Sequence, residues 1–400
     1  MNMIWPIAGR DFWKINDPQN IVEIEWTHNY YLDYKKLAEN YIKCSYEVFS
    51  NVVESGHDNI KSDQWFIVGV FLARQAIELG LKSLICKVET QARKIENIFE
   101  DACHDLLKLF NYYWEYENTY LNNDEKKWLE DYLRDVELVD SKSDVFRFPF
   151  EDDFLRKYRN KFLDCVDVAN NIIQAYRLIE KCTGDADYIN EIDLELQPSF
   201  FIFATHGIGN CGIWDSLSDR GFHEKVNGYY AVIDYIMSCK KLTEDEKVYP
   251  VLFMLRNTLE LCLKRVFYCR VENGVPRKVF LSKRRSHLLK KDLWKNVKPV
   301  IEDYTRETNN DLSVLSIVEK QIVELNRIDK NGDMFRYPTS YSLEYRFDHI
   351  RLDLNNVYEY ISSVINYLDA CDTMLENIAE IEAEMRAEYQ AEMRAEYGWY

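Results

Sequence analysis

The sequence contains few residues that interrupt helices. Only 8 prolines and 13 glycines occur among 400 residues, and residues that favour helices dominate. Apolar residues make up 47% of the chain, which is enough to form extensive cores. This composition predicts a mainly all-α fold, and the length predicts two or three domains.

The chain also lacks long apolar runs. The longest, Phe66–Ala73, is far shorter than the ~20 residues that a membrane-spanning helix requires. The first residues, MNMIWPIAGRDF, have neither the basic start nor the apolar core of a signal peptide. Ten cysteines occur without a CxxC pair or metal-ligand spacing. We therefore expect a cytoplasmic protein with reduced thiols, no membrane attachment, no metal and no cofactor.

Basic residues are outnumbered, and the net charge is −18. An acidic surface repels nucleic acid at long range, so RNA binding requires a local basic patch. The segment 277–298 carries nine Lys and Arg against one Asp, and a solvated helix face is the alternative interpretation. Its candidates for contact with nucleic acid are Lys283, Arg284, Arg285, Lys290 and Lys291.

One apolar stretch of the sequence occurs twice. Residues 71–84 read FLARQAIELGLKSL and residues 253–266 read FMLRNTLELCLKRV, with Phe, Arg, Glu, Leu, Leu and Lys at the same places. Each copy predicts a helix that is apolar on most faces and therefore central to a bundle. The polar residues step by four, which places them along one side of each helix. They are Arg74, Glu78 and Lys82 in the first copy, and Arg256, Glu260 and Lys264 in the second.

Two further matches follow in the same order. His104 lies 30 residues after the arginine of the first copy, and His287 lies 31 residues after that of the second. Downstream, DSKSDVFRFP (140–149) matches DKNGDMFRYP (329–338), which aligns Arg147 with Arg336. The residue before a proline avoids helical geometry, so each FR[FY]P segment is expected to be an ordered loop.

The repeat predicts two tandem bundles of four or five helices with a small β or loop element between them. In the first, the last helix is expected at about 155–182, and VEIEW (22–26) is a strand candidate that could pair with the linker. The expected boundaries are 1–185 for the first bundle with a β-like lead-in at 20–26, 186–222 for a linker with a strand-like segment and a Gly turn, 223–382 for the second bundle, and 383–400 for a helical tail with an octad repeat.

The shared polar residues have two interpretations. In one, Arg, Glu, His and the loop arginine of each copy form an internal network that fixes the register of the helices. In the other, they line a cleft where arginine binds phosphate and histidine transfers protons. The spacing is compatible with both.

At these residues the sequence resembles the HEPN superfamily of helical domains linked to nucleotide and RNA biology. The resemblance rests on ARQAIELGLKSL with HDLLKL, and on LRNTLELCLKRV with SHLLKKDLW and FRYP. It covers roughly 30–182 and 224–382. It implies bundles of four or five helices that often pair as dimers, so two fused copies would form a built-in pseudo-dimer. Many members act in prokaryotic anti-phage, abortive-infection or toxin–antitoxin systems.

Active members of that superfamily are metal-independent ribonucleases with an Arg followed four to six residues later by a His. None of the seven histidines has this spacing here, and Arg346 and His349 are three apart. The resemblance therefore implies a catalytically degenerate protein that binds RNA or a nucleotide, or that regulates a partner protein in a defence or stress system. The alternatives are a ribonuclease with a rearranged site and a pure interaction scaffold, with a homo-oligomer possible in each case. The catalytic candidates for the rearranged site are His287, Arg336, His349 and Arg346.

Overall fold

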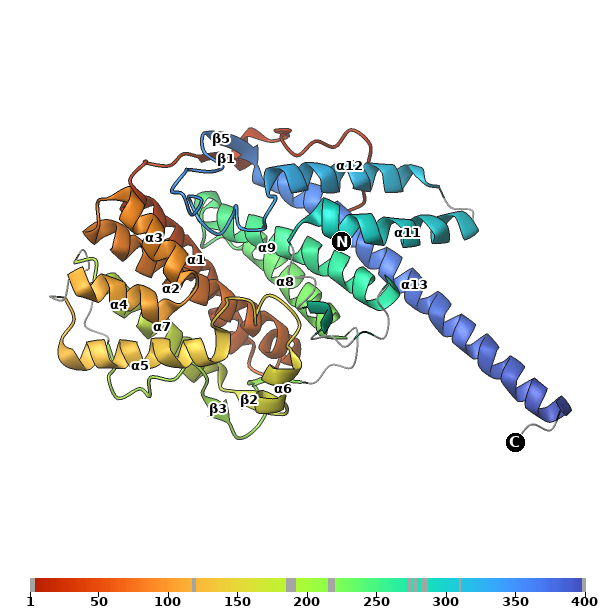
Figure 1. The fold of residues 1–400 in the computed structure, drawn as a ribbon, viewed down its shortest axis with the longest axis horizontal. Coiled ribbons are helices and arrows are strands. Elements are labelled where there is room, and N and C mark those ends of the chain that lie inside the picture. The colour runs from red at the N-terminus through yellow and green to blue at the C-terminus, as the bar shows by residue number, and fades with distance from the viewer. Residues whose placement is uncertain are drawn as a thin grey trace.

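The computed structural model describes residues 4–116, 120–184, 192–214, 220–271, 275, 279–281, 287–308 and 311–397 (Figure 1). The expected mainly all-α fold is confirmed. Within the described part of the chain, every helix is too short or too polar to cross a membrane. The domain boundaries expected from the sequence remain predictions.

The first half of the chain is a group of helices around α2. Their bounds are α1 (Tyr30–Ser55), α2 (Phe66–Val88), α3 (Ala92–Ala102), α4 (Leu106–Tyr116), α5 (Asn123–Asp140), α6 (Asp152–Tyr158) and α7 (Cys165–Lys181), with a π-helical turn η2 (Lys61–Trp65) before α2. α2 packs against α1, α4 and α7, and its residues 66–85 are all buried. Gly69 allows the close approach of α1, because a Cβ there would lie 2.8 Å from the Phe49 ring.

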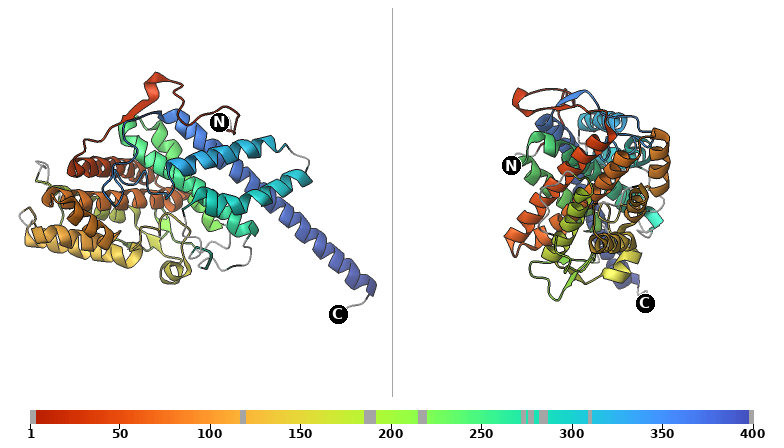
Figure 2. Two further views of the ribbon diagram at one scale, coloured as in Figure 1. Left: turned by 45° about the horizontal axis from the view of Figure 1, so that its top comes forward. Right: turned by 90° about the vertical axis from the view of Figure 1, so that its left-hand side faces the viewer.

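The second half is a similar group of helices around α9. Its elements are α8 (Arg220–Ser238), α9 (Glu244–Val266), η3 (Phe267–Val271), η4 (Leu289–Trp294), α11 (Lys295–Glu307), α12 (Ser313–Ile328) and α13 (Leu354–Tyr397). α9 begins at a capping box, in which Thr243 and Glu246 satisfy each other's backbone N–H groups. α9 packs against α8 and α13, and it also contacts α1 of the first half. Figures 1 and 2 show the two groups of helices side by side.

Two small sheets tie distant segments together. β1 (Ile21–Ile24) pairs antiparallel with β5 (Ile350–Asp353), and β2 (Phe162–Leu163) lies between β3 (Phe203–Ala204) and β4 (Cys211–Gly212). A short 3-10 helix, η1 (Pro18–Asn20), precedes β1. The backbone N–H groups of Asn16 and Asp17 both donate to Asp353, at 2.9 and 3.0 Å. The N-terminal segment is therefore fastened to the second half of the chain.

Two expectations about these segments are wrong. The 22–26 segment pairs with β5 and not with the linker, because the hydrogen bonds to Asp353 hold it against the second half. The helix expected at 155–182 is interrupted by β2. The helix α6 ends at Tyr158 because Arg159 leaves helical geometry (ψ 139°), and Asp164 caps the N-terminus of the next helix.

α13 extends far beyond the body of the protein (Figures 1 and 2). Its first part is anchored by Arg265 of α9, a fully buried side chain that pairs with Asp372 at 2.9 Å and with Asp369 at 2.7 Å. Residues 381–394 are all exposed, and they include the octad residues Met385, Tyr389 and Met393. The tail is thus a continuation of α13 that packs against nothing in the described chain.

Deleting residues 383–400 should therefore change the free energy of unfolding by less than about 0.5 kcal/mol, as surface changes do. Urea denaturation measures this. Asp372→Ala is the contrasting variant, because it leaves the buried Arg265 with only the half-exposed Asp369, and it should cost about 3 kcal/mol, the lower end of the cost of breaking a buried pair. A truncated protein that loses several kcal/mol would show that the tail packs on the body, and a lower molar mass in light scattering would assign it to an oligomer contact.

Candidate functional site between the two halves

A buried carboxylate organises the polar residues of α2. Glu78 is fully buried, pairs with Arg74, and accepts hydrogen bonds from Lys82 at 2.8 Å and from the Tyr337 hydroxyl at 2.6 Å. Nδ1 of His104 lies 3.0 Å from the same carboxylate. Burial raises the pKa of Glu78, but Lys82, His104 and Arg74 outweigh it and hold that pKa well below its usual range. Glu78 is therefore ionised.

The second half builds the same cluster on α9. Glu260 accepts hydrogen bonds from Lys264 at 2.7 Å and from Arg256 at 3.1 Å, and His287 Nδ1 lies 2.9 Å away. Arg256 also donates to the backbone carbonyl of His287 at 2.6 Å, as Arg74 donates to that of His104 at 2.7 Å. Each arginine thus holds the backbone of the histidine of its own half against the central helix.

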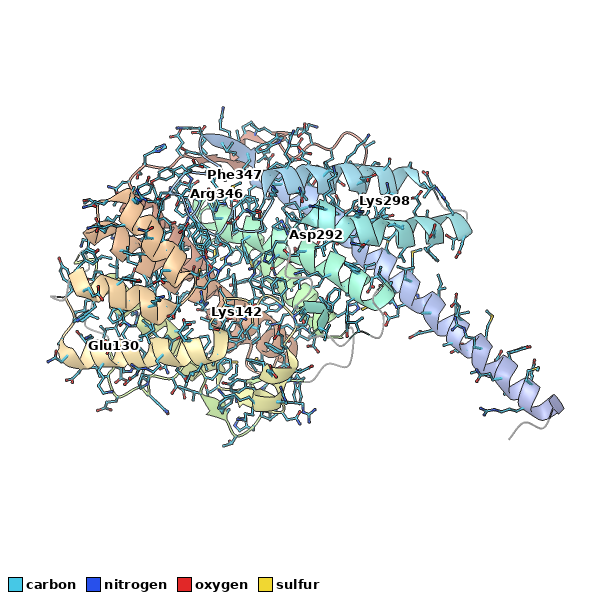
Figure 3. The ribbon with its side chains drawn as sticks, in the orientation of Figure 1. Glu130, Lys142, Asp292, Lys298, Arg346 and Phe347 are labelled. Atoms are coloured by element: carbon cyan, nitrogen blue, oxygen red, sulfur yellow. The ribbon has the colours of Figure 1, made fainter. Side chains whose placement is uncertain are left out.

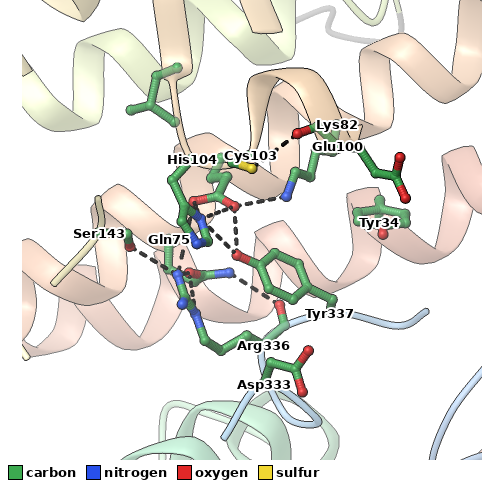
Figure 4. Close-up of polar contacts among 12 residues, drawn as sticks. Tyr34, Gln75, Lys82, Glu100, Cys103, His104, Ser143, Asp333, Arg336 and Tyr337 are labelled. Carbon is green, nitrogen blue, oxygen red and sulfur yellow. Dashed lines mark hydrogen bonds and ion pairs between the residues drawn. The ribbon is translucent and has the colours of Figure 1, made fainter. Parts of the chain in front are cut away.

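The two FR[FY]P loops exchange partners between the halves. Arg336 donates to Gln75 Oε1 of α2 through Nε at 3.0 Å and through a terminal nitrogen at 2.7 Å, and the Gln75 amide donates back to the Arg336 carbonyl (Figure 4). Arg147 of the first half donates to Asn257 of α9 at 3.3 Å, and the Asn257 amide donates to the Arg147 carbonyl. Each loop arginine is therefore bound by an amide side chain of the other half.

Aromatic rings continue this exchange. Phe71 and Phe253, which are equivalent positions of α2 and α9, stack with centroids 4.8 Å apart and planes at 17°. The Arg336 guanidinium lies 5.8 Å from the Phe71 ring, and that of Arg147 lies 5.4 Å from the Phe253 ring. The two halves therefore meet at this stacked pair with an approximate twofold relation.

The loops are shaped by the aspartates that precede them. Asp140 Oδ1 accepts from the backbone N–H groups of 144 and 145, and Asp329 Oδ1 accepts from those of 332, 333 and 334. Ser143 (φ 57°) and Gly332 (φ 74°) occupy equivalent positions and share a left-handed backbone. The Ser143 hydroxyl accepts a hydrogen bond from Arg336 at 2.9 Å, so the turn of one loop holds the arginine of the other.

A cavity of about 510 Å³ opens where the loops cross. Its walls come from both halves of the chain and include His104, Arg147, Phe148, Lys264, His287, Arg336, Tyr337 and Tyr341. Near Lys142 and Lys157 the wall is exposed, and Phe154 and Tyr158 add aromatic surface. Figure 3 marks Lys142 at the end of α5, between the two groups of helices.

The charge of the cavity differs from that of the whole protein. Its cations are Lys142, Arg147, Lys157, Lys264 and Arg336, and its acids are Asp144, Glu151, Asp153 and Asp333. Five cations against four acids give a near-neutral lining on a protein of net charge −18. An anionic ligand is repelled by an acidic protein, so it requires a region such as this one, where the local charge is close to zero.

The two histidines of the cavity have defined tautomers. An ionised carboxylate only accepts hydrogen bonds, so Glu78 and Glu260 require a proton on Nδ1 of His104 and His287. Burial lowers the pKa of His104 to about 4, with Glu78 acting in the opposite direction. His104 is therefore neutral near pH 7, with an unprotonated Nε2. Among the described residues, Nε2 of neither histidine has a hydrogen-bond partner.

The structure brings together some of the candidate residues that the sequence indicated and separates others from them. The polar set on α2 and α9, the two histidines and the two loop arginines are brought together, but His349 and Arg346 do not line the cavity. Arg346 pairs with Asp333 at 3.0 Å, and Figure 3 places it close to the β1–β5 pair. Lys290 and Lys291 are exposed on η4, whereas 283–285 lie outside the described residues.

Sequence reasoning missed the two residues that receive the loop arginines. Gln75 and Asn257 each follow the arginine of the repeated stretch directly. An amide at the same position of both copies, inside an apolar helix, was the available signal. It did not indicate that the partner would come from the other copy.

Comparisons with protein families, with curated proteins and with solved structures found no match for this chain.

Glu260→Gln should lower the free energy of unfolding by about 3–5 kcal/mol, because it leaves Lys264 buried without a carboxylate and Arg256 with only Asp329, 3.7 Å away. The matched control is Glu319→Gln. Glu319 pairs with Lys298 at 2.8 Å but is 38% exposed, so its loss should cost at most about 1 kcal/mol. Urea denaturation of both variants checks this, and equal losses would contradict the role of the buried cluster.

His104 should titrate with a pKa of about 4, and Glu78→Gln should lower that pKa further by removing the carboxylate that raises it. NMR titration of the imidazole measures both values, with the signal assigned by its loss in His104→Gln. An unfolded His takes up its proton near pH 6.5, so between about pH 6.5 and 4 the unfolded state binds more protons. His104 therefore costs stability as the pH falls through this window, and His104→Gln should lose less stability on acidification than the wild type. A midpoint above 6 would contradict the burial.

Proposed function

We propose that the chain is a catalytically degenerate tandem protein of HEPN type that binds RNA or a nucleotide in the cavity between its halves. In this proposal it acts as a sensing or partner-regulating component of a prokaryotic defence or stress system. The observation that carries the proposal is the cavity itself, which both FR[FY]P loops build by reaching into the opposite half.

The size and lining of the cavity support a ligand of this chemical class. A volume of about 510 Å³ lies within the range of about 300–1,000 Å³ of small-molecule sites. Phe154, Tyr158 and Tyr341 provide rings on which a base can stack. Lys142 and Lys157 provide exposed ammonium groups for phosphate.

The contacts of the loop arginines support loss of catalysis. Arg336 is buried and directs its nitrogens at Gln75 and Ser143, and Arg147 is buried against Asn257. The donors of Arg336 that are satisfied inside the protein are not available to a developing phosphate charge. This arrangement favours arginines that brace the two halves.

A second candidate, a metal-independent ribonuclease with a rearranged site, is favoured by the glutamate–histidine pairs. Glu78 and Glu260 orient His104 and His287 through Nδ1, which is how a general base is held in one tautomer. Both histidines line the cavity, so each Nε2 is a candidate for proton transfer.

The binding experiment uses the untagged full chain, a labelled nucleoside triphosphate and a short labelled single-stranded RNA as probes. Fluorescence polarisation should detect binding of at least one of them. The double variant Lys142→Glu/Lys157→Glu should weaken binding by about tenfold or more for each charge-assisted hydrogen bond that it removes. The matched control is the double variant Lys14→Glu/Lys240→Glu, which makes the same change of net charge at exposed lysines outside the cavity. Failure of both probes to bind the wild type would favour the interaction scaffold.

Incubation of the protein with tRNA and mRNA in EDTA separates the two candidates. The degenerate protein leaves both RNAs intact. Cleavage that is abolished in His104→Gln or His287→Gln, with RNA binding retained, would establish the ribonuclease instead. Mass spectrometry of nucleotides and RNA that co-purify with the protein identifies the ligand in either case.

A further inference from the structure

The β1–β5 ribbon ends in two histidines that lie far from each other in the sequence and do not line the cavity. His28 follows β1, and His349 directly precedes β5. Their ring centroids are 6.2 Å apart, and both residues have a left-handed backbone, with φ of 57° and 53°. The antiparallel register, with Ile24 opposite Ile350, brings these two segments together from opposite ends of the chain.

One carboxylate oxygen lies between the two imidazoles. Oδ2 of Asp348 is 3.0 Å from His28 Nε2 and 3.6 Å from His349 Nε2. The ligand atoms that these three residues offer all lie within 4.8 Å of one another. Two imidazole nitrogens and one carboxylate oxygen form a donor set that suits zinc and its neighbours in the first transition row.

The aspartate is held in place by the backbone. Its other oxygen, Oδ1, accepts hydrogen bonds from the N–H of Trp26 at 3.0 Å and from the N–H of His349 at 2.9 Å. Asp348 is only 13% exposed, so its orientation is set by the fold. An oriented carboxylate, with one oxygen committed to amides and the other turned to two imidazoles, has the hydrogen-bond support that is typical of a metal ligand.

We propose that His28, Asp348 and His349 bind one divalent transition-metal ion of the zinc class. When metal–ligand bonds of about 2.0–2.1 Å are arranged tetrahedrally, neighbouring ligand atoms lie roughly 3.3 Å apart. The observed distances from Asp348 Oδ2 to Nε2 of His28 and of His349, 3.0 and 3.6 Å, are close to this value. The ion bonds to Nε2 of each histidine and to Oδ2 of the aspartate, and water completes its coordination, since the histidines are 57% and 71% exposed.

Neighbouring side chains support this geometry. Glu25 Oε1 lies 3.8 Å from Nδ1 of His349, so its negative charge is close to the ring without a hydrogen bond. The Tyr345 ring lies against that of His28, with centroids 4.5 Å apart, and its hydroxyl donates to Asp33 at 2.7 Å. The ring of His28 is thus packed against a tyrosine that is itself held by a hydrogen bond.

Binding of an ion at this site would link two distant parts of the chain. β1 leads into α1 of the first half, and β5 leads into α13 of the second half. An ion held by His28 and His349 therefore cross-links the entrances of both helices next to a short two-stranded ribbon. Because the ion binds the folded chain, it should raise the melting temperature.

The test titrates ZnCl₂ into untagged full-length protein that has been treated with EDTA and desalted, using isothermal calorimetry. One ion per chain should bind. His28→Ala, His349→Ala and Asp348→Asn should each weaken zinc binding by at least about tenfold, since even changes to residues that only support a metal ligand cost about 10–100-fold. The matched controls are His57→Ala and His206→Ala, which remove exposed histidines elsewhere and should bind as the wild type does.

Two further readouts identify the ligands. Co²⁺ in place of Zn²⁺ should give the visible absorption of a low-coordinate nitrogen–oxygen site, and this absorption should disappear in His28→Ala. Zinc should raise the melting temperature of the wild type and of the controls but not that of the ligand variants, and this comparison also shows that each variant folds. The proposal is overturned if no ion binds at one per chain, or if the ligand variants bind as tightly as the wild type, which would leave adventitious binding only.

Discussion

Two buried carboxylates fix the relative positions of the segments around the central helices. Taking a carboxylate out of water costs several kcal/mol, so Glu78 and Glu260 are tolerable only because a lysine and an arginine lie against each of them. The same two oxygens then fix a histidine through Nδ1. In each half, the cluster therefore fixes the positions of the central helix, the histidine segment and the loop relative to one another. The geometry of the cavity between the halves follows from these positions.

The second constraint is that neither half satisfies its own loop arginine. Arg147 and Arg336 are buried, and a buried guanidinium needs acceptors. Those acceptors are Asn257 and Gln75 of the opposite half, so the halves complete each other. The copies are not identical, because Tyr337 donates to Glu78 whereas its counterpart, Phe148, packs its ring against His287 and under Lys264. A duplicated chain can therefore support one asymmetric cavity.

The proposed zinc-class site and the cavity have no residue in common, but both form in the same way. Both arise where segments distant in the sequence are brought side by side, the cavity by the crossed loops and the metal site by the β1–β5 ribbon. His28, Asp348 and His349 are not part of the cavity lining, so replacing them would leave that lining unchanged. The proposed ion links the segments that lead into α1 and α13, and neither of these helices lines the cavity.

The sequence by itself determined the helical character, the central helices and the Arg, Glu and Lys that each central helix brings to its polar cluster, because spacing of three to four residues translates directly into one side of a helix. Even His104 and His287 could be assigned to the clusters, since they recur at a fixed distance from the repeated stretch. Only the tertiary structure decided that Arg336 crosses to Gln75, that β1 pairs with β5, and that His28 meets His349. These interactions join residues 261 to 332 positions apart, and no local periodicity encodes them because they depend on how two finished halves pack.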